Sequence, residues 1–153
     1  MNYWLMKSEP DVFGIADLKS RPRQTERWDG VRNYQARNFL RAMQRGDEAF
    51  FYHSSCAEPG VAGIVRIVRA AYPDPSAFDP GSPFHDPRST PEKPLWFMVD
   101  VKLVRKTKRL IPLSELKANA ALKNMRLVSR GNRLSVMPVT AREWSTILKM
   151  EKN

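Results

Sequence analysis

The chain has 153 residues, the length of about one domain, and its 42% hydrophobic and 27% charged residues are close to a globular average. Its one cysteine, Cys56, excludes an intramolecular disulfide and a cysteine-based zinc site and favours a reducing compartment. No apolar run approaches the roughly 18 residues of a membrane span, and the first residues do not resemble a signal peptide. We therefore expect one domain over residues 1–153 that has no membrane partner.

The positive charge is concentrated in the last third of the chain. The formal net charge is +10, and residues 101–153 hold 13 basic against 3 acidic side chains, which accounts for the whole excess. A basic imbalance of this kind indicates a polyanionic partner, most often a nucleic acid. The alternative is a basic surface that only keeps the protein dispersed in solution. On charge alone, nucleic-acid binding is only slightly favoured over this alternative.

The N-terminal part of the chain predicts one strand and one clear helix. Residues 2–7 are nearly all large and apolar, which suits a strand buried on both faces. A short helix from about residue 14 to 18 and a long polar loop over residues 20–30 follow. Apolar side chains then recur at helical spacing over residues 32–45, which predicts a helix with Gly46 as its C-cap.

The middle of the chain predicts three strands and one long loop. Residues 47–54 and 61–72 are expected to be strands joined by a turn. Residues 73–94 hold seven of the twelve prolines, so they cannot form a central strand or helix and are expected to be a surface loop at the rim of a site. Residues 95–106 alternate between apolar and polar side chains as a strand does, and the basic run at 105–109 is expected to end it in a bend.

The C-terminal part predicts short helices, a short strand and a final helix. Pro112 is expected to open a short helix, with a further turn near Leu122 and a strand over residues 133–139. Residues 140–143 read T-A-R-E, the capping-box pattern that begins a helix. Five short strands without regular βαβ alternation indicate an α+β fold, and a small, partly closed β-barrel with peripheral helices fits best.

The sequence contains no recognisable catalytic or metal-binding machinery. His53 and Ser54 are neighbours on a predicted strand, so their side chains point to opposite faces. No metal-binding spacing links His53 to His85, and phosphate-binding glycine loops and the G-x-S-x-G elbow are absent from the sequence. We expect no metal, no cofactor and no catalysis, although these observations do not exclude an enzyme.

A loop tryptophan suggests a binding pocket. Trp28 is followed by Asp29 and Gly30, and Asn33 and Tyr34 lie close behind. Such a tryptophan either packs in the core, which is the more common outcome, or lines a pocket, which its loop setting favours. An aromatic wall beside amide and hydroxyl groups suits a flat polar ring such as a nucleobase.

Seven segments together resemble the EVE domain family, in the same order and over essentially the whole chain. The resemblance implies a PUA-like barrel of about five to six strands, related to YTH domains that read methylated adenine in RNA, with no known catalytic activity. It also implies a pocket for a modified base, with modified cytosine in DNA the leading candidate. The segments are NYWLMKSEP at 2–10, WDGVRNYQARN at 28–38, GDEAFFYHS at 46–54, AYPDPSAFDP at 71–80, STPEKPLWFMVDV at 89–101, LKANAALKNMRLVSRGNRLSVMPVT at 116–140 and REW at 142–144.

The resemblance implies a base-binding pocket built from four segments. Each residue also has an ordinary alternative: Val31 and Tyr52 as core, Ser8 as a turn cap, Arg133 as the partner of a carboxylate. The family pattern differs here at Met137 and Gly131, which puts the identity of the base in doubt. The implied pocket residues are Lys7, Ser8, Trp28, Val31, Asn33, Tyr34, Tyr52, His53, Ser54, Arg133, Leu134 and Ser135.

The resulting hypothesis is a non-catalytic reader of a modified, flipped base in DNA or RNA. The base stacks on Trp28, while Ser8, Asn33 and Ser54 bind its polar edge, so Trp28→Ala is expected to stay folded and lose the base. Phosphate contacts position the strand and the pocket specifies the base. The expected phosphate-binding residues are Arg105, Lys106, Lys108, Arg109, Lys123, Arg126 and Arg130.

Two other functions stay open at this point. One is an enzyme acting on a modified nucleotide or base, with His53 as acid or base and Lys7 or Glu9 assisting. The other is an interaction module whose basic face meets an acidic protein. For every reading we expect a monomer, in the cytoplasm if the host is bacterial and in the nucleus if it is eukaryotic.

Overall fold

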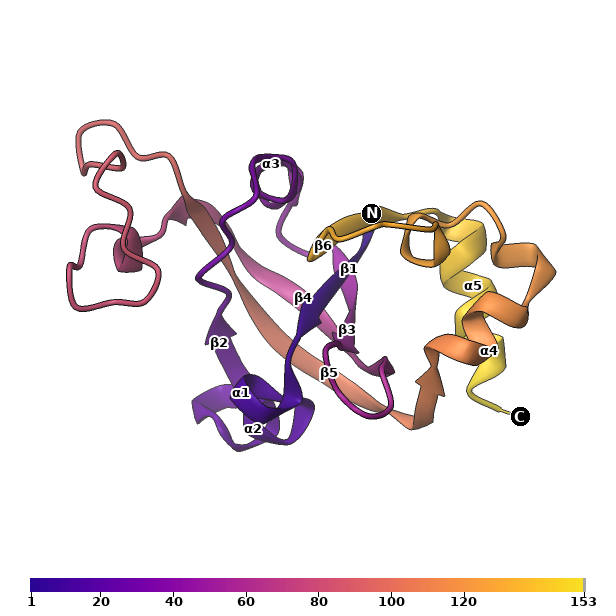
Figure 1. Cartoon of the computed structure of the whole chain (residues 1–153). Coiled ribbons are helices and arrows are strands. Elements are labelled where there is room, and N and C mark those ends of the chain that lie inside the picture. Colours follow the sequence, from indigo (N-terminus) through magenta and orange to yellow (C-terminus); the bar gives the residue numbers. More distant parts are fainter. Residues whose placement is uncertain (153) are drawn as a thin grey trace.

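The computed structural model describes residues 1–152 and is built on a six-stranded mixed sheet (Figure 1). The strands are hydrogen-bonded in the order β2-β5-β4-β3-β1-β6, with β1 parallel to β3 and all other neighbours antiparallel. The edge strands β2 and β6 do not pair, so the sheet is curved but not closed, and the expected α+β class is confirmed. The strands are β1 (Tyr3–Ser8), β2 (Thr25–Arg27), β3 (Glu48–His53), β4 (Gly60–Pro73), β5 (Phe97–Pro112) and β6 (Val136–Val139).

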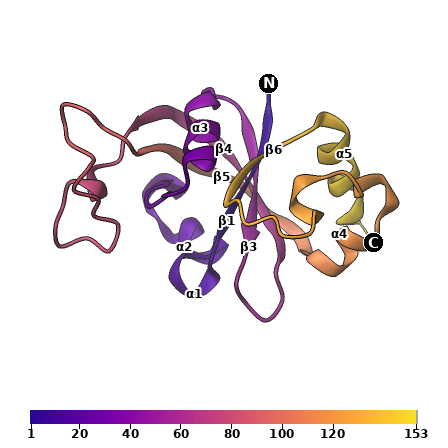
Figure 2. The ribbon, with the colours of Figure 1, turned by 45° about the horizontal axis from the view of Figure 1, so that its top comes forward.

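Helices cover the sheet in separate groups (Figures 1 and 2). Two short helices follow β1, one longer helix follows β2, and the last two lie side by side at the C-terminal end of the molecule. None of the helices in residues 1–152 is both long and apolar enough for a membrane crossing. The helices are α1 (Pro10–Phe13), α2 (Ile15–Ser20), α3 (Tyr34–Ala42), α4 (Leu113–Ala118) and α5 (Ala141–Met150).

The sheet carries a hydrophobic cluster on each face, which explains the apolar run at the start of the chain. Along β1, Trp4 and Met6 pack into one cluster, together with side chains of α2 and α3, while Leu5 packs into the other, beneath α4 and α5. Because a cluster that includes helix side chains packs on each side of the sheet, both faces of β1 are covered. The prediction of a strand buried on both faces is confirmed.

Three predicted boundaries are wrong for identifiable reasons. The basic run at 105–109 does not end the strand: β5 continues to Pro112 because its pairing with β4 resumes after an irregularity. The predicted polar loop contains β2, which is held by pairing with β5 rather than by its own sequence. The cap of α3 is the extended Met43, and Gly46, with φ +97°, makes the later turn into β3.

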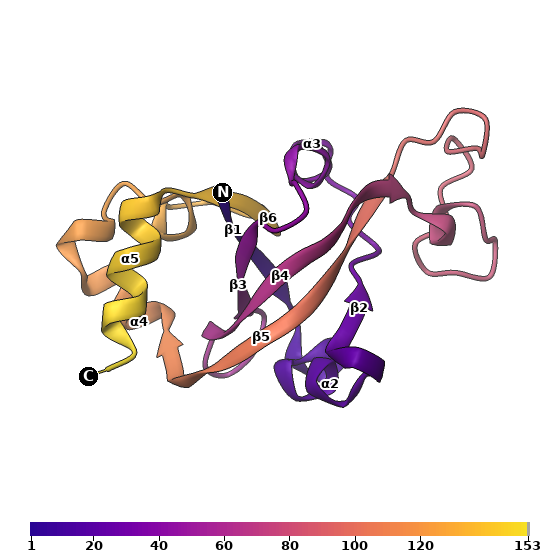
Figure 3. The ribbon, with the colours of Figure 1, turned by 180° about the vertical axis from the view of Figure 1, so that it is seen from behind.

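The proline-rich segment projects from the far end of the β4–β5 ribbon, away from α4 and α5 (Figures 1 and 3). Apart from one 3-10 turn, it contains turns and bends, as its prolines predict. Its base is fixed by Asp74, which is fully buried and accepts hydrogen bonds from the Gly30 N–H (2.8 Å) and the Ser76 hydroxyl (2.6 Å). The segment is thus attached directly to the loop that follows β2.

Candidate functional site

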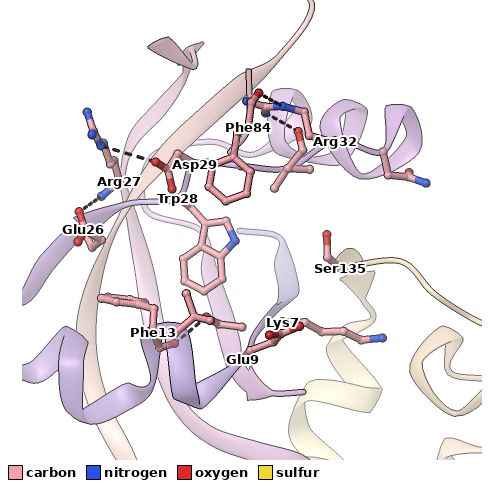
Figure 4. Close-up of a pocket in the computed structure, with 15 residues that line it drawn as sticks. Lys7, Glu9, Phe13, Glu26, Arg27, Trp28, Asp29, Arg32, Phe84 and Ser135 are labelled. Atoms are coloured by element: carbon pink, nitrogen blue, oxygen red, sulfur yellow. Dashed lines mark hydrogen bonds and ion pairs between the residues drawn. The ribbon is translucent and has the colours of Figure 1, made fainter. Parts of the chain in front are cut away.

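A cavity of about 750 Å³ opens at the end of β1, and we call it the first cavity (Figure 4). Its lining comes from the end of β1, from α1, from residues 26–33 and from two distant residues, Phe84 and Ser135. The volume lies within the range of small-ligand sites, about 300–1,000 Å³. Loops carry most of this lining, and the sheet and the attached proline-rich segment hold those loops in place.

Trp28 belongs to the core and to the wall of the first cavity at once. Only 7% of the residue is exposed, and its ring meets Phe51 edge to face with centroids 5.4 Å apart. Its indole nitrogen has no hydrogen-bond partner in the described part of the chain, and Figure 4 shows this nitrogen on the side of the cavity that faces Ser135. The expectation that Trp28→Ala stays folded conflicts with this burial. A tryptophan with so little exposed surface stabilises the fold in addition to lining the cavity.

Phe84 is a second aromatic wall that the sequence analysis missed. Arg32 holds it by donating from Nε and Nη2 to the Phe84 carbonyl oxygen, at 3.0 and 2.9 Å. The ring covers Gly30, where a Cβ atom would lie 2.7 Å from the nearest ring carbon. Gly30 also has φ +81°, so both its conformation and this contact require glycine. No local sequence signal could pair these residues, because the fold brings them together.

Asp29 supplies a half-buried carboxylate to the first cavity and was also missed. It accepts no hydrogen bond from another residue of the described chain, and the nearest cationic atom, Arg27 Nε, lies 4.0 Å away. Burial and then the carboxylate of Asp74 raise the pKa of Asp29, while Arg27 opposes them. The Asp29 carboxylate can therefore accept a hydrogen bond from a ligand in the first cavity.

Half of the residues expected to form the pocket do line the first cavity. Ser8 uses its hydroxyl to donate to the Phe13 carbonyl oxygen at 2.6 Å. The side-chain Oδ1 of Asn33 caps α3 by accepting from the Ala36 N–H at 2.9 Å, which leaves the side-chain NH₂ for another partner. The six are Lys7, Ser8, Trp28, Val31, Asn33 and Ser135.

The other six expected pocket residues do not line the first cavity. His53 is covered by the start of α2, because its Nε2 accepts the Ile15 N–H at 3.1 Å, and burial lowers its pKa. Tyr34 stacks on Trp96 with ring centroids 4.9 Å apart. Tyr52 packs into the hydrophobic cluster on the other face of the sheet from Trp28, and it lines a second cavity. Three more of the expected residues do not line the first cavity: Ser54, Arg133 and Leu134.

The seven residues expected to bind phosphate divide into three groups. Arg105 and Arg109 each donate two hydrogen bonds to one carboxylate, Arg105 to Glu151 (2.7 and 2.8 Å) and Arg109 to Glu115 (3.0 and 2.7 Å). Their positive charge is therefore largely compensated. By contrast, Lys123 and Arg130 line a second cavity. The remaining three line neither cavity: Lys106, Lys108 and Arg126.

Across residues 1–152, His, Cys, Asp and Glu side chains do not gather in a group of three or more that could hold a metal ion. The groups at the first cavity are instead hydrogen-bond donors, acceptors and aromatic rings. They can bind a flat polar ligand by packing and by directed hydrogen bonds.

Solved structures with the same fold include a human protein bound to DNA. The crystal structure of human THYN1 protein in complex with 5-methylcytosine-containing DNA has a TM-score of 0.96 and 51% identity, covering 100% of this chain and 99% of that one. A Pseudomonas putida crystal structure has a TM-score of 0.92 and 57% identity, covering 97% and 99%. A Zymomonas mobilis ASCH protein, at 10% identity and a TM-score of 0.56, shares the fold alone.

Sequence comparisons agree with the structural ones. Human thymocyte nuclear protein 1 is 51% identical over 168 residues, which cover 99% of this chain and 74% of that protein. The EVE domain model matches residues 2–150. On this match over nearly its whole length, the chain belongs to the EVE domain family.

Proposed function

We propose that this protein binds DNA and reads a modified cytosine, with 5-methylcytosine the leading candidate, without catalysing a reaction on it. The observation that carries the proposal is the complex of human THYN1 with 5-methylcytosine-containing DNA, because that protein is 51% identical to this one over the whole chain. The first cavity adds chemical support, since it combines aromatic walls with polar groups on a scale that accepts one base.

Binding such a base inside the first cavity requires that the base leave the helix. A base in duplex DNA is reached by flipping it out of the stack into a pocket that packs against its ring and binds its Watson–Crick edge. Trp28 and Phe84 supply the packing surfaces of the first cavity. The Asp29 carboxylate and the free Asn33 amide supply an acceptor and a donor for the polar edge.

The alternative functions have less support. An enzyme built on His53 would need that imidazole in the cavity, yet its Nε2 is already used to hold α2. A module that only presents a basic face would not need a cavity with a half-buried carboxylate. The monomeric state and the location in cytoplasm or nucleus stay predictions.

We predict that Asp29 distinguishes 5-methylcytosine from thymine. The two bases share the 5-methyl group, but cytosine carries an N4 amine that donates, where thymine has an O4 that accepts. A carboxylate accepts a hydrogen bond from the N4 amine and repels O4. An asparagine amide can accept from N4 with its oxygen or donate to O4 with its NH₂. The wild type should prefer 5-methylcytosine to thymine by roughly 10- to 100-fold, since one good base contact is worth about 1–3 kcal/mol. Asp29→Asn should bind the two bases with nearly equal affinity.

The test is a fluorescence titration of wild type and variant with oligonucleotides that differ only in a single 5-methylcytosine or thymine. Glu9→Gln is the matched control, because Glu9 is a second carboxyl at the same cavity but is exposed at its rim. The control should keep the full preference. An unchanged preference in Asp29→Asn would refute the role of Asp29, while absence of any preference in the wild type would refute the proposed function itself.

A further inference from the structure

A second cavity of about 600 Å³ lies beside the first, and its charge is of one sign only. Among the residues that the structure describes, four cationic side chains line it and no carboxylate does. Its other lining groups include the apolar side chains of Leu113, Leu127 and Val128. Four cations around a partly apolar hollow repel one another, and apolar walls screen this repulsion less than water does. The cationic residues are Lys7, Lys117, Lys123 and Arg130.

The exposed cations of the second cavity lack carboxylate partners in the described chain, in contrast to Arg105 and Arg109. Arg105 and Arg109 have carboxylate partners, but the side chains of Lys117, Lys123 and Arg130 make no hydrogen bond or ion pair with the described chain. They do not stabilise the fold by pairing. An uncompensated cluster of this kind is suited to an anion that arrives from outside.

Lys7 connects the two cavities. It is the last residue but one of β1, it is half-buried, and it lines both cavities. Its Nζ lies 6.0 Å from the ring centre of Tyr52 and forms no ion pair with a carboxylate of residues 1–152. A ligand that fills the first cavity therefore has a cation of the second cavity at its edge.

We propose that the second cavity binds a phosphate group of the strand whose base occupies the first cavity. The base and its phosphate are separated by one sugar, and the two cavities share Lys7, so one nucleotide can engage both. This inference rests on the proposed function for the origin of the phosphate. It places the main phosphate contact at Lys117, Lys123 and Arg130, away from the carboxylate-bound Arg105 and Arg109.

The experiment compares 5-methyl-2′-deoxycytidine with its 3′- and 5′-monophosphates by calorimetric titration at low salt. The wild type should bind one monophosphate about tenfold more tightly than the nucleoside, because hydrogen bonds between cations and phosphate are strong. The variant Lys117→Gln/Lys123→Gln/Arg130→Gln should bind nucleoside and monophosphates alike, at the nucleoside affinity of the wild type. These side chains are exposed and unpaired, so the variant should fold.

The matched control removes the same charge elsewhere, at three exposed basic residues that line neither cavity: Arg45→Gln/Arg142→Gln/Lys149→Gln. It should keep the tenfold gain. The inference is overturned if the wild type binds neither monophosphate more tightly than the nucleoside. It is also overturned if the control loses as much affinity for the monophosphate as the cavity variant does.

A separate readout keeps this inference distinct from the proposed function. Inorganic phosphate alone should shift the amide NMR signals of Lys123 and Gly131 in the wild type and not in the cavity variant. If no nucleoside binds but these shifts occur, the proposed function fails and the phosphate site stands. If nucleoside binds and phosphate causes no such shift, the phosphate site fails and the base-reading proposal stands.

Discussion

Replacing Trp28 with alanine is expected to lower the free energy of unfolding by about 3–5 kcal/mol, the usual cost of removing a buried tryptophan. The side chain is 7% exposed and packs edge to face on Phe51 and Phe13. Its loss removes these contacts and joins the vacated space to the first cavity. Chemical denaturation measures the change, and a loss below about 1 kcal/mol would contradict the assignment of Trp28 to the core.

Trp28→Phe separates the two roles of this residue. A phenyl ring retains most of the packing but removes the indole N–H, the group that has no partner in the described chain. The variant should therefore stay folded and lose up to about tenfold in affinity for the modified base, since one net hydrogen bond is worth about 0.5–1.5 kcal/mol. Affinity equal to wild type would show that the indole nitrogen does not contact the base.

Local patterns predicted those parts of the fold that local interactions determine. The T-A-R-E pattern forms a capping box in which Thr140 and Glu143 bond reciprocally, with α5 beginning at Ala141. The helical spacing that begins at Ala36 buries Ala36 and Leu40, as predicted. In these cases the residues that interact lie within one or two turns of each other, so the sequence shows both partners at once.

Contacts between distant segments were not predictable in the same way. Alternation along β3 could not reveal that the Nε2 of His53 accepts a hydrogen bond from the distant Ile15 N–H. The net positive charge of the last third did not show that Glu151 and Glu115 hold Arg105 and Arg109. The site residues that were missed, Asp29 and Phe84, depend on where the proline-rich segment folds back. That placement is determined by Asp74, whose partners are scattered along the chain.

Asp74→Ala is accordingly expected to destabilise the protein by about 3–5 kcal/mol, the usual consequence of removing one partner of a buried ion pair. Asp74 is fully buried, and Oδ2 accepts from Arg32 Nη1 at 3.1 Å as well as from the Gly30 N–H. Without it, the guanidinium and the backbone N–H lose their acceptor, and Arg32 no longer holds Phe84 over Gly30. Thermal melting and the affinity for the modified base should therefore decline together.

The pH dependence of this loss identifies its cause. Burial opposes ionisation of Asp74, but hydrogen bonds from Ser76, Gly30 and Arg32 outweigh it and hold its pKa below the ordinary value of about 3.9. The stability that the carboxylate contributes is thus fully present above about pH 3.9 and is lost as the pH falls through the lower pKa of the folded state. The difference in unfolding free energy between wild type and Asp74→Asn should be largest near pH 7 and should narrow below about pH 4. A difference that is the same at pH 7 and pH 3 would mean that shape, and not the ionised carboxylate, attaches the proline-rich segment to the first cavity.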